Sequence, residues 1–190
     1  MHIFVFVGPP GAGKGTQCTL MSSRLGYTHI STGDMIRKEI SSNSILGKRI
    51  KYIVDNGNLV DDETVIDCLI HQMSVLDASS SKVVLWDGVP RNLFQAKKLD
   101  EKYGLSITSV LNISAPLDSL FDRFLRRWTC SKCGKVESFS LDFKSEGFIC
   151  QKCSAVSSYF KRNDDSSEVV KSRFEIYKSQ TMPILDYYRS

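Results

Sequence analysis

A glycine-rich stretch near the N-terminus, Gly8-Pro-Pro-Gly-Ala-Gly-Lys-Gly-Thr16, contains the residue types that bind phosphate. It follows the apolar run 2–7 and leads into a helical pattern. Glycines let backbone N–H groups converge on phosphate oxygens, and the start of the following helix adds partial positive charge. In the general phosphate-loop pattern a Ser or Thr follows the lysine, whereas here Gly15 follows Lys14 and Thr16 comes one position later. The lysine and the strand–loop–helix context predict a phosphate site rather than a chance turn.

Four of the six cysteines form two pairs, Cys130-x2-Cys133 and Cys150-x2-Cys153, with 16 residues between the pairs. This spacing is typical of zinc sites, and four thiolates fill a tetrahedral shell, which predicts a structural site. In a chain that we expect to be cytosolic, such pairs favour metal over disulfides. An insert of about 30 residues cannot build a large core, so a metal would stabilise it. Iron can also occupy such a site, and four unliganded thiols are the alternative that the double spacing disfavours.

Several charged residues lie at the end of a predicted strand or on one face of a predicted helix, where their side chains could contact a ligand. Asp87 ends the apolar run 82–86, and a carboxylate at the carboxyl end of a parallel strand faces the ligand crevice. There it could orient the water shell of Mg²⁺, although it could also cap a loop. Arg123 and Arg127 are one helical turn apart and would share a face.

Polar residues also begin the helical pattern that follows residue 31. A helix N-terminus at Thr32 and Gly33, with Arg37 one turn on, suits a phosphate group. A plain N-cap for Thr32 and a solvated surface position for Arg37 are the alternatives. Gln95 offers an amide donor and acceptor that could read the polar edge of a base, or it could be an ordinary surface residue.

The elements that must position these residues alternate between strands and helices. Short apolar runs predict strands at 2–7, 27–30, 82–86 and 107–113. Helical periodicity lies between and after them at 14–25, 33–42, 46–56, 61–76, 92–103 and 116–127, with a last helix from about residue 164. The alternation predicts an α/β fold with a parallel sheet covered by helices on both faces. Residues 128–160 lack helical periodicity and predict a β-rich insert.

The composition places few further constraints on function. The chain of 190 residues is 42% hydrophobic and 24% charged, with a net charge of +4, as expected of a soluble globular protein. The charge excess is too small to indicate a nucleic-acid platform. No apolar run reaches the length of a membrane span, and we see no secretory signal, so we expect a cytoplasmic protein without membrane or nucleic-acid partners.

The pattern G-x-P-G-x-G-K-G-T resembles the loop of the adenylate kinase family of nucleoside monophosphate kinases. The resemblance continues, in the family's order, at Ser31-Thr-Gly-Asp-Met-Ile-Arg37, at Asp87-Gly-Val-Pro-Arg91 with Gln95, at Asp122-Arg123-x3-Arg127, and at Arg162-Asn-Asp-Asp165 with Arg173. The paired cysteines resemble the zinc-carrying lid of the family's long-lid members. Val89 departs from the usual phenylalanine, which could loosen packing around the acceptor while leaving Gly88, Pro90 and Arg91 in place.

This resemblance implies a domain organisation and a reaction. It implies a core at 1–30, 61–122 and 161–190, a helical acceptor-binding insert at 31–60 and a metal-stapled lid at 123–160. The implied reaction is reversible phosphoryl transfer from MgATP to AMP, giving two ADP, with Mg²⁺ bound to ATP and Zn²⁺ structural in the lid. We expect a monomer with ATP and AMP as its ligands.

The resemblance also assigns roles to individual residues. Those implied to bind ATP are Gly11, Ala12, Gly13, Lys14, Gly15, Thr16, Arg123 and Arg127. Those implied to bind AMP are Thr32, Arg37, Asn58, Leu59, Val60, Gly88, Val89, Pro90, Arg91, Gln95, Arg162 and Arg173. The implied catalytic residues are Lys14, Asp87, Arg91, Arg123, Arg127, Arg162 and Arg173, and the metal ligands are Cys130, Cys133, Cys150 and Cys153. Asn163, Asp164 and Asp165 could cap the last helix or join the phosphate network.

Other functions remain open at this point. Within the same class the chain could be a GTP:AMP or UMP/CMP kinase. From a different class, the cysteine quartet could belong to a zinc-ribbon nucleic-acid-binding module, against which the full set of phosphate-site motifs speaks. A non-catalytic nucleotide sensor is a third alternative, although Lys14 and the matched arginines are intact.

The resemblance raises one expectation about the donor base. Family members typically continue past the last helix into a further strand and helix whose loop contacts the donor adenine, whereas this sequence stops at Tyr187-Tyr188-Arg189-Ser190. A shortened sequence is one alternative, and base recognition by lid and core residues is another. We expect weak discrimination of the donor base, with GTP within roughly tenfold of ATP, the factor that one hydrogen bond implies.

Overall fold

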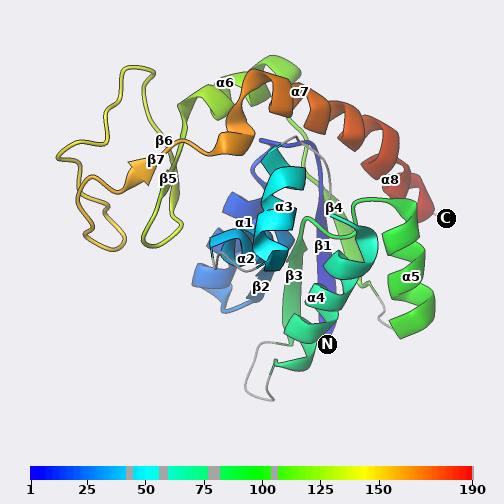
Figure 1. Ribbon diagram of the computed structural model, residues 1–190. Coiled ribbons are helices and arrows are strands. Elements are labelled where there is room, and N and C mark those ends of the chain that lie inside the picture. The colour runs from blue at the N-terminus through cyan, green and yellow to red at the C-terminus, as the bar shows by residue number, and fades with distance from the viewer. Residues whose placement is uncertain (42–44, 56–59, 77–81, 104–106, 190) are drawn as a thin grey trace.

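The computed structural model describes residues 1–41, 45–55, 60–76, 82–103 and 107–189. Its main sheet has four parallel strands, β1 (His2–Val7), β2 (Thr28–Ser31), β3 (Val83–Asp87) and β4 (Ser109–Asn112), in the order β2-β3-β1-β4 (Figure 1). Because β1 and β3 are central, their middle residues are buried on both faces, as their continuous apolar runs predicted. All four predicted strands are confirmed, although β4 is shorter than the run 107–113.

Alternate side chains of the strands build two cores on the two faces of this sheet. Val5, Val7 and Trp86 pack on one face with buried residues of α4 (Asp62–Ser74) and α5 (Leu93–Tyr103). Phe6 and Leu85 pack on the other face with Cys18 of α1 (Lys14–Leu25). Helices therefore cover both faces of a parallel sheet, which confirms the predicted fold class.

Two helices, α2 (Thr32–Ser41) and α3 (Ile45–Asp55), lie between β2 and α4 in the chain and pack against one another. Buried Ile50 of α3 and buried Val60 belong to the same core as the sheet face that α4 covers. Each predicted helix of this region lies within two residues of its expected bounds. Gly57, which follows the predicted helix 46–56, lies outside the described residues.

A second, smaller sheet occupies residues 127–160 and lies to one side of the main sheet (Figure 1). After α6 (Leu117–Arg126), strands β5 (Arg127–Cys130), β6 (Val136–Ser138) and β7 (Tyr159–Phe160) pair antiparallel in the order β6-β5-β7. Aromatic side chains form its small core: the ring of Phe139 stacks on that of Phe143 at 3.8 Å between centroids. The predicted β-rich insert is confirmed.

The C-terminal segment is less regular than the single helix that the sequence predicts. It contains a 3₁₀ turn (Asn163–Asp165), α7 (Ser167–Ile176), a π-helical segment (Tyr177–Thr181) and α8 (Pro183–Tyr187). The N-cap of α7 is Ser166, whose hydroxyl accepts from the N–H of Val169 at 3.4 Å. Within the described residues, no helix has the length and apolar character that crossing a membrane requires.

Candidate active site

The glycine-rich stretch forms a loop between β1 and α1. A Cβ at Gly8 would lie 2.0 Å from the carbonyl oxygen of Ile113, so only glycine fits there. Lys14 begins α1, and its Nζ donates to the carbonyl oxygens of Gly8 at 2.8 Å and Pro9 at 3.0 Å. Burial lowers the pKa of Lys14 from 10.5 to about 8, while the nearby Asp87 carboxylate acts in the opposite direction. The lysine therefore lies across a loop whose N–H groups and helix start suit an anion.

Asp87 reaches this loop from the carboxyl end of β3, as predicted. A Cβ at Gly15 would lie 2.9 Å from its Oδ2, so the glycine at this position leaves room for the carboxylate. On its other side the Nε2 of His29 lies 3.7 Å from the same oxygen. The sequence assigned no role to His29, because nothing local indicates that its strand places it beside Asp87.

The acceptor-side residues predicted at the start of α2 lie next to Asp87. The buried hydroxyl of Thr32 donates to the carbonyl oxygen of Asp87 at 3.3 Å, and Ser31 accepts from the N–H of Asp34. Arg37 pairs with Asp34 at 2.5 Å. Burial raises the pKa of Asp34, but the Arg37 cation outweighs this and holds it below its ordinary value. Of the predicted segment 58–60, Val60 is buried in the core, whereas Asn58 and Leu59 lie outside the described residues.

The segment after β3 brings Arg91 to the same place. Gly88 has a φ of 91°, and a Cβ there would lie 2.6 Å from the Thr32 hydroxyl, so glycine permits the close approach. The Nε of Arg91 donates to the carbonyl oxygen of Gly88 at 2.7 Å. Burial and the neighbouring Arg173 cation lower the pKa of Arg91 to about 10, which still leaves it charged at neutral pH. Val89 is fully buried, and Gln95 is only 1% exposed.

The remaining predicted arginines surround this cluster, and carboxylates bind two of them. Arg173 pairs with Asp164 at 2.7 Å, and Arg127 pairs with Asp165. These two aspartates are therefore ionic partners of the arginines, and the cap of α7 is Ser166 instead. Arg123 donates to the carbonyl oxygen of Ala12 at 3.0 Å, and Arg162 donates to the Thr129 hydroxyl at 2.8 Å.

These residues form one electropositive centre. The charges of Asp87, Arg91 and Arg173 all act on the pKa of Lys14, and those of Arg173, Asp87 and Arg37 act on that of Arg91. The partly buried cations of this cluster outnumber its carboxylates, which favours a polyanionic ligand, because its charge would offset their repulsion and desolvation. The arrangement suits phosphoryl groups held between the loop at 8–15 and the start of α2.

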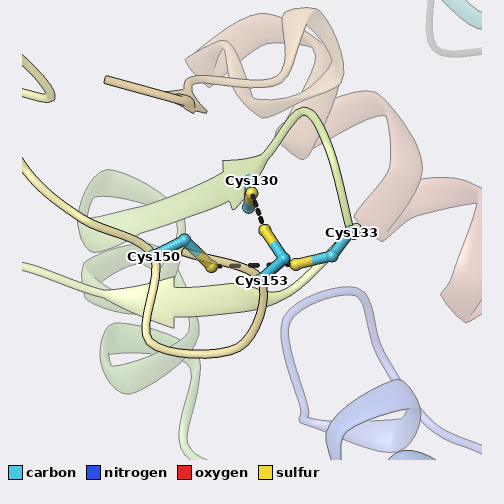
Figure 2. A group of neighbouring side chains, drawn as sticks. All are labelled: Cys130, Cys133, Cys150 and Cys153. Atoms are coloured by element: carbon cyan, nitrogen blue, oxygen red, sulfur yellow. Dashed lines mark hydrogen bonds between the residues drawn. The ribbon is translucent and has the colours of Figure 1, made fainter. Parts of the chain in front are cut away.

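The four paired cysteines converge in the small sheet, as predicted (Figure 2). Their sulfur atoms all lie within 4.8 Å of one another, and the pairs Cys130–Cys153 and Cys133–Cys150 are each 3.7 Å apart. Tetrahedral zinc with Zn–S bonds of about 2.3 Å requires sulfurs about 3.8 Å apart, so the quartet fits this ion. A hydrogen bond from the Tyr159 hydroxyl to Cys150 lowers the pKa of that thiol to about 6, which favours the thiolate that a metal needs.

The sequence missed three polar residues that contact the predicted site residues. Asp62 binds the Gln95 amide at 2.7 Å, the Thr181 hydroxyl donates to the carbonyl oxygen of Arg91 at 2.7 Å, and Tyr159 binds Cys150 at 3.4 Å. Asp62 looked like an ordinary acid in the first turn of a helix. Only the fold shows that Asp62 and Thr181 meet partners far away in the chain, and that the Tyr159 hydroxyl reaches Cys150.

A parallel sheet with a phosphate loop after its first strand and a cluster of partly buried cations defines a nucleotide phosphotransferase. The family model for adenylate kinase matches residues 6–190. The adenylate kinase of Archaeoglobus fulgidus is 38% identical, covering 97% of this chain and 85% of the relative. That of Streptomyces avermitilis is 42% identical, covering 98% and 84%, and that of Caldicellulosiruptor bescii is 39% identical, covering 98% and 86%. The chain therefore belongs to the adenylate kinase family, whose members are ATP:AMP phosphotransferases.

Proposed function

We propose that this site transfers a phosphoryl group reversibly from MgATP to AMP, giving two ADP. The observation that carries the proposal is the convergence of Lys14, Arg91 and Arg173 between the glycine-rich loop and the start of α2, with Asp87 beside the first two. In the forward direction an oxygen of the AMP phosphate attacks the γ-phosphorus of ATP, and the bond to the β–γ bridging oxygen breaks. AMP phosphate is already a nucleophile at neutral pH, so the reaction requires alignment and charge neutralisation more than a general base.

On the donor side, the loop residues Gly11 to Thr16 would bind the ATP phosphates through their backbone N–H groups. The Lys14 ammonium would leave the two loop carbonyl oxygens that it now binds and donate to phosphate oxygens instead. Arg123 already lies against the loop at Ala12. Arg127 would exchange Asp165 for donor phosphate when the small sheet closes over the site. In the complex these cationic side chains would thus bind phosphate oxygens in place of the carbonyl and carboxylate oxygens of the protein that they bind here.

On the acceptor side, Thr32, Arg37 and the segment 58–60 would bind AMP, with Arg91 on its phosphate. Gln95 would read the adenine edge beside Gly88, Val89 and Pro90. Arg162 and Arg173 would flank the transferring phosphoryl group and stabilise the charge on its oxygens. Arg173 lies near both Lys14 and Arg91, which supports a position between donor and acceptor.

Two metal ions belong to the proposal. Asp87 fits Mg²⁺, because its carboxylate lies beside the phosphate loop and could orient the ion's water shell. Mg²⁺ would supply charge neutralisation on the donor phosphates. The cysteine quartet fits Zn²⁺ in a structural role, because four thiolates leave no open coordination position.

We further propose the domain organisation that the family resemblance implied. Residues 1–30, 61–122 and 161–190 form the core, 31–60 the acceptor-binding insert and 123–160 the lid. Closure of insert and lid would exclude water and limit hydrolysis of ATP. We propose a cytoplasmic monomer whose ligands are ATP and AMP.

A coupled assay of ADP formation tests this function, with ATP or GTP as donor and AMP, CMP or UMP as acceptor. We expect turnover with ATP and AMP, and much less with the pyrimidine acceptors. Turnover that requires GTP, or that prefers UMP or CMP, would identify a different member of the class. Oligonucleotide binding that weakens with salt, in a protein without kinase turnover, would contradict the proposal altogether.

A further inference from the structure

Four polar residues form a hydrogen-bonded network on the acceptor side, which we call the Asp62 network: Asp62, Arg91, Asn92 and Gln95. The Nε2 of Gln95 donates to the Oδ1 of Asp62 at 2.7 Å, and its Oε1 accepts from the backbone N–H of Arg91 at 2.7 Å. The Nδ2 of Asn92 donates to both carboxylate oxygens of Asp62, at 2.9 and 3.1 Å. The amide of Gln95 is thus a bridge between helix α4 and the acceptor-phosphate arginine.

The direction of these bonds depends on Asp62. A carboxylate can only accept hydrogen bonds, so the amide nitrogen of Gln95 must face Asp62 and its amide oxygen must face Arg91. Turning the amide over would bring its NH₂ group against the N–H of Arg91, which is also a donor. Gln95 is 1% exposed, so an amide turned the wrong way would leave the Arg91 N–H without an acceptor in a buried place.

Arg91 receives further support on its other side. Its carbonyl oxygen accepts from the Thr181 hydroxyl at 2.7 Å, and its Nε donates to the carbonyl oxygen of Gly88 at 2.7 Å. The backbone of Arg91 is therefore bound at both its N–H and its C=O by side chains, the first from Gln95 four residues on and the second from the distant Thr181. Of these contacts, only the one through Gln95 leads back to the helix that follows the acceptor segment.

Capping of α4 does not explain Asp62. That role belongs to Asp61, whose Oδ1 accepts from the N–H of Thr64 at 2.9 Å and whose Oδ2 accepts from the Thr64 hydroxyl at 2.9 Å. Asp62 instead directs its carboxylate to the start of α5, where both its oxygens accept from Asn92, the residue before the helix, and one also accepts from Gln95.

We infer that Asp62 is a positioning residue for AMP: it fixes the Gln95 amide, which in turn fixes Arg91 for the acceptor phosphate. The inference rests on the proposed function, since it takes Arg91 as the residue that binds this phosphate. It is compatible with a role of Gln95 toward adenine, because an amide has two N–H groups and two oxygen lone pairs, and the network uses one of each.

The first test compares Asp62→Asn with Asp67→Asn, the same chemical change at an exposed position of the same helix. An asparagine at position 62 presents an NH₂ group to a site that holds two donors. We expect KM for AMP to rise about tenfold, the factor for one hydrogen bond to a charged group, while KM for ATP stays within about twofold. Asp67→Asn should change neither, and thermal melting should show that both variants are folded. An equal effect on AMP and ATP, or none beyond that of Asp67→Asn, overturns the inference.

A swap of donor and acceptor makes the test independent of base recognition. In Gln95→Glu, two carboxylates face each other at 62 and 95, so the network breaks. In the double variant Asp62→Asn/Gln95→Glu, the amide NH₂ of residue 62 can donate to the carboxylate of residue 95, which can still accept from Arg91. Both variants have Glu at position 95, so any loss of adenine contact is common to them. We expect the double variant to have a lower KM for AMP than Gln95→Glu, and no recovery would overturn the inference.

A readout without catalysis separates this inference from the proposed function. Hydrogen exchange of the Arg91 amide, measured by NMR, reports its bond to Gln95 directly. Its protection should fall in Asp62→Asn, recover in the double variant and stay unchanged in Asp67→Asn. Unchanged protection in Asp62→Asn overturns the inference even if the wild type is an active kinase. Absence of ADP formation by the wild-type protein would instead contradict the proposed function, whatever the Arg91 amide does.

Discussion

The side-chain nitrogen of Lys14 lies 2.8 Å from the carbonyl oxygen of Gly8 and 3.0 Å from that of Pro9. The lysine thus occupies the loop that we propose for the donor phosphates, and ATP must draw it away from two neutral acceptors. Phosphate oxygens are charged acceptors, so this exchange is favourable as long as the lysine carries its proton.

Binding of ATP should therefore weaken at alkaline pH. Burial lowers the pKa of Lys14 from 10.5 to about 8 in the nucleotide-free protein. Below pH 8 the lysine is already charged. Above pH 8, ATP must either bind a neutral lysine or bind with uptake of a proton by the lysine. The Kd for ATP should therefore rise with pH until the pH exceeds the higher pKa that Lys14 has in the complex. Calorimetry with MgATP across this range measures the effect. Lys14→Arg, which stays charged, should give a flat profile, and a flat wild-type profile would contradict the assigned pKa.

We expect Lys14→Ala and Arg91→Ala each to reduce turnover by two or more orders of magnitude, about the loss seen when a group that stabilises transition-state charge is removed. In the proposed complex both side chains would contact phosphate charge that shifts during transfer. Few hydrophobic contacts depend on them, so the fold should survive. Steady-state kinetics and circular dichroism measure the two quantities. Arg24→Ala, at an exposed position of α1, is the control and should keep normal turnover. Near-normal turnover in folded Lys14→Ala or Arg91→Ala would refute the assignment.

The sequence predicted well those features that depend on neighbours in the chain. The spacing of glycines between an apolar run and a helix predicted the loop at 8–16. The two C-x2-C pairs, of which Cys130 and Cys133 are one, predicted the cluster of four cysteines. The parallel sheet follows from alternation of β-rich runs with helical periods, and its central strands were readable from their uninterrupted apolar residues.

Contacts between distant residues were not predictable in the same way. Arg127 and Asp165 are 38 positions apart, and Asp62 and Gln95 are 33 positions apart. Each of these acids has a local explanation as a residue near a helix start, and nothing in a single sequence says that its partner is an arginine or an amide elsewhere. Likewise, the π-helical segment at 177–181 divides a helix that hydrophobic periodicity alone makes continuous.

Gly15→Ala should separate stability from activity. Gly15 lies within α1 without a positive φ, so alanine should raise the free energy of unfolding by up to about 1 kcal/mol through its helix propensity. Its Cβ, however, would lie 2.9 Å from the Oδ2 of Asp87, and that carboxylate must shift. We expect an unchanged or higher Tm, a lower kcat and a higher Mg²⁺ concentration for half-maximal rate. An alanine variant with the Mg²⁺ dependence of the wild type would show that the position of Asp87 is not critical.

Metal removal should destabilise the small sheet. We expect one zinc ion per chain, bound by Cys130, Cys133, Cys150 and Cys153, whose sulfurs are already at tetrahedral spacing. Because metal binding contributes to the folding free energy of such small sites, Cys133→Ser should lose the ion and lower the Tm by at least about 5 °C.

Elemental analysis measures the metal content, and thermal melting measures the Tm, of the native protein and its variants. Cys68→Ser, at an exposed cysteine of α4 outside the quartet, is the matched control and should keep both the metal and the Tm. Treatment with a chelator should lower the Tm of the wild type and of Cys68→Ser, but not that of Cys133→Ser, because the ion is already absent from it. Native protein that contains iron would keep the structural role but change the metal. Native protein without any metal, with four titratable thiols at these positions, would contradict the site itself.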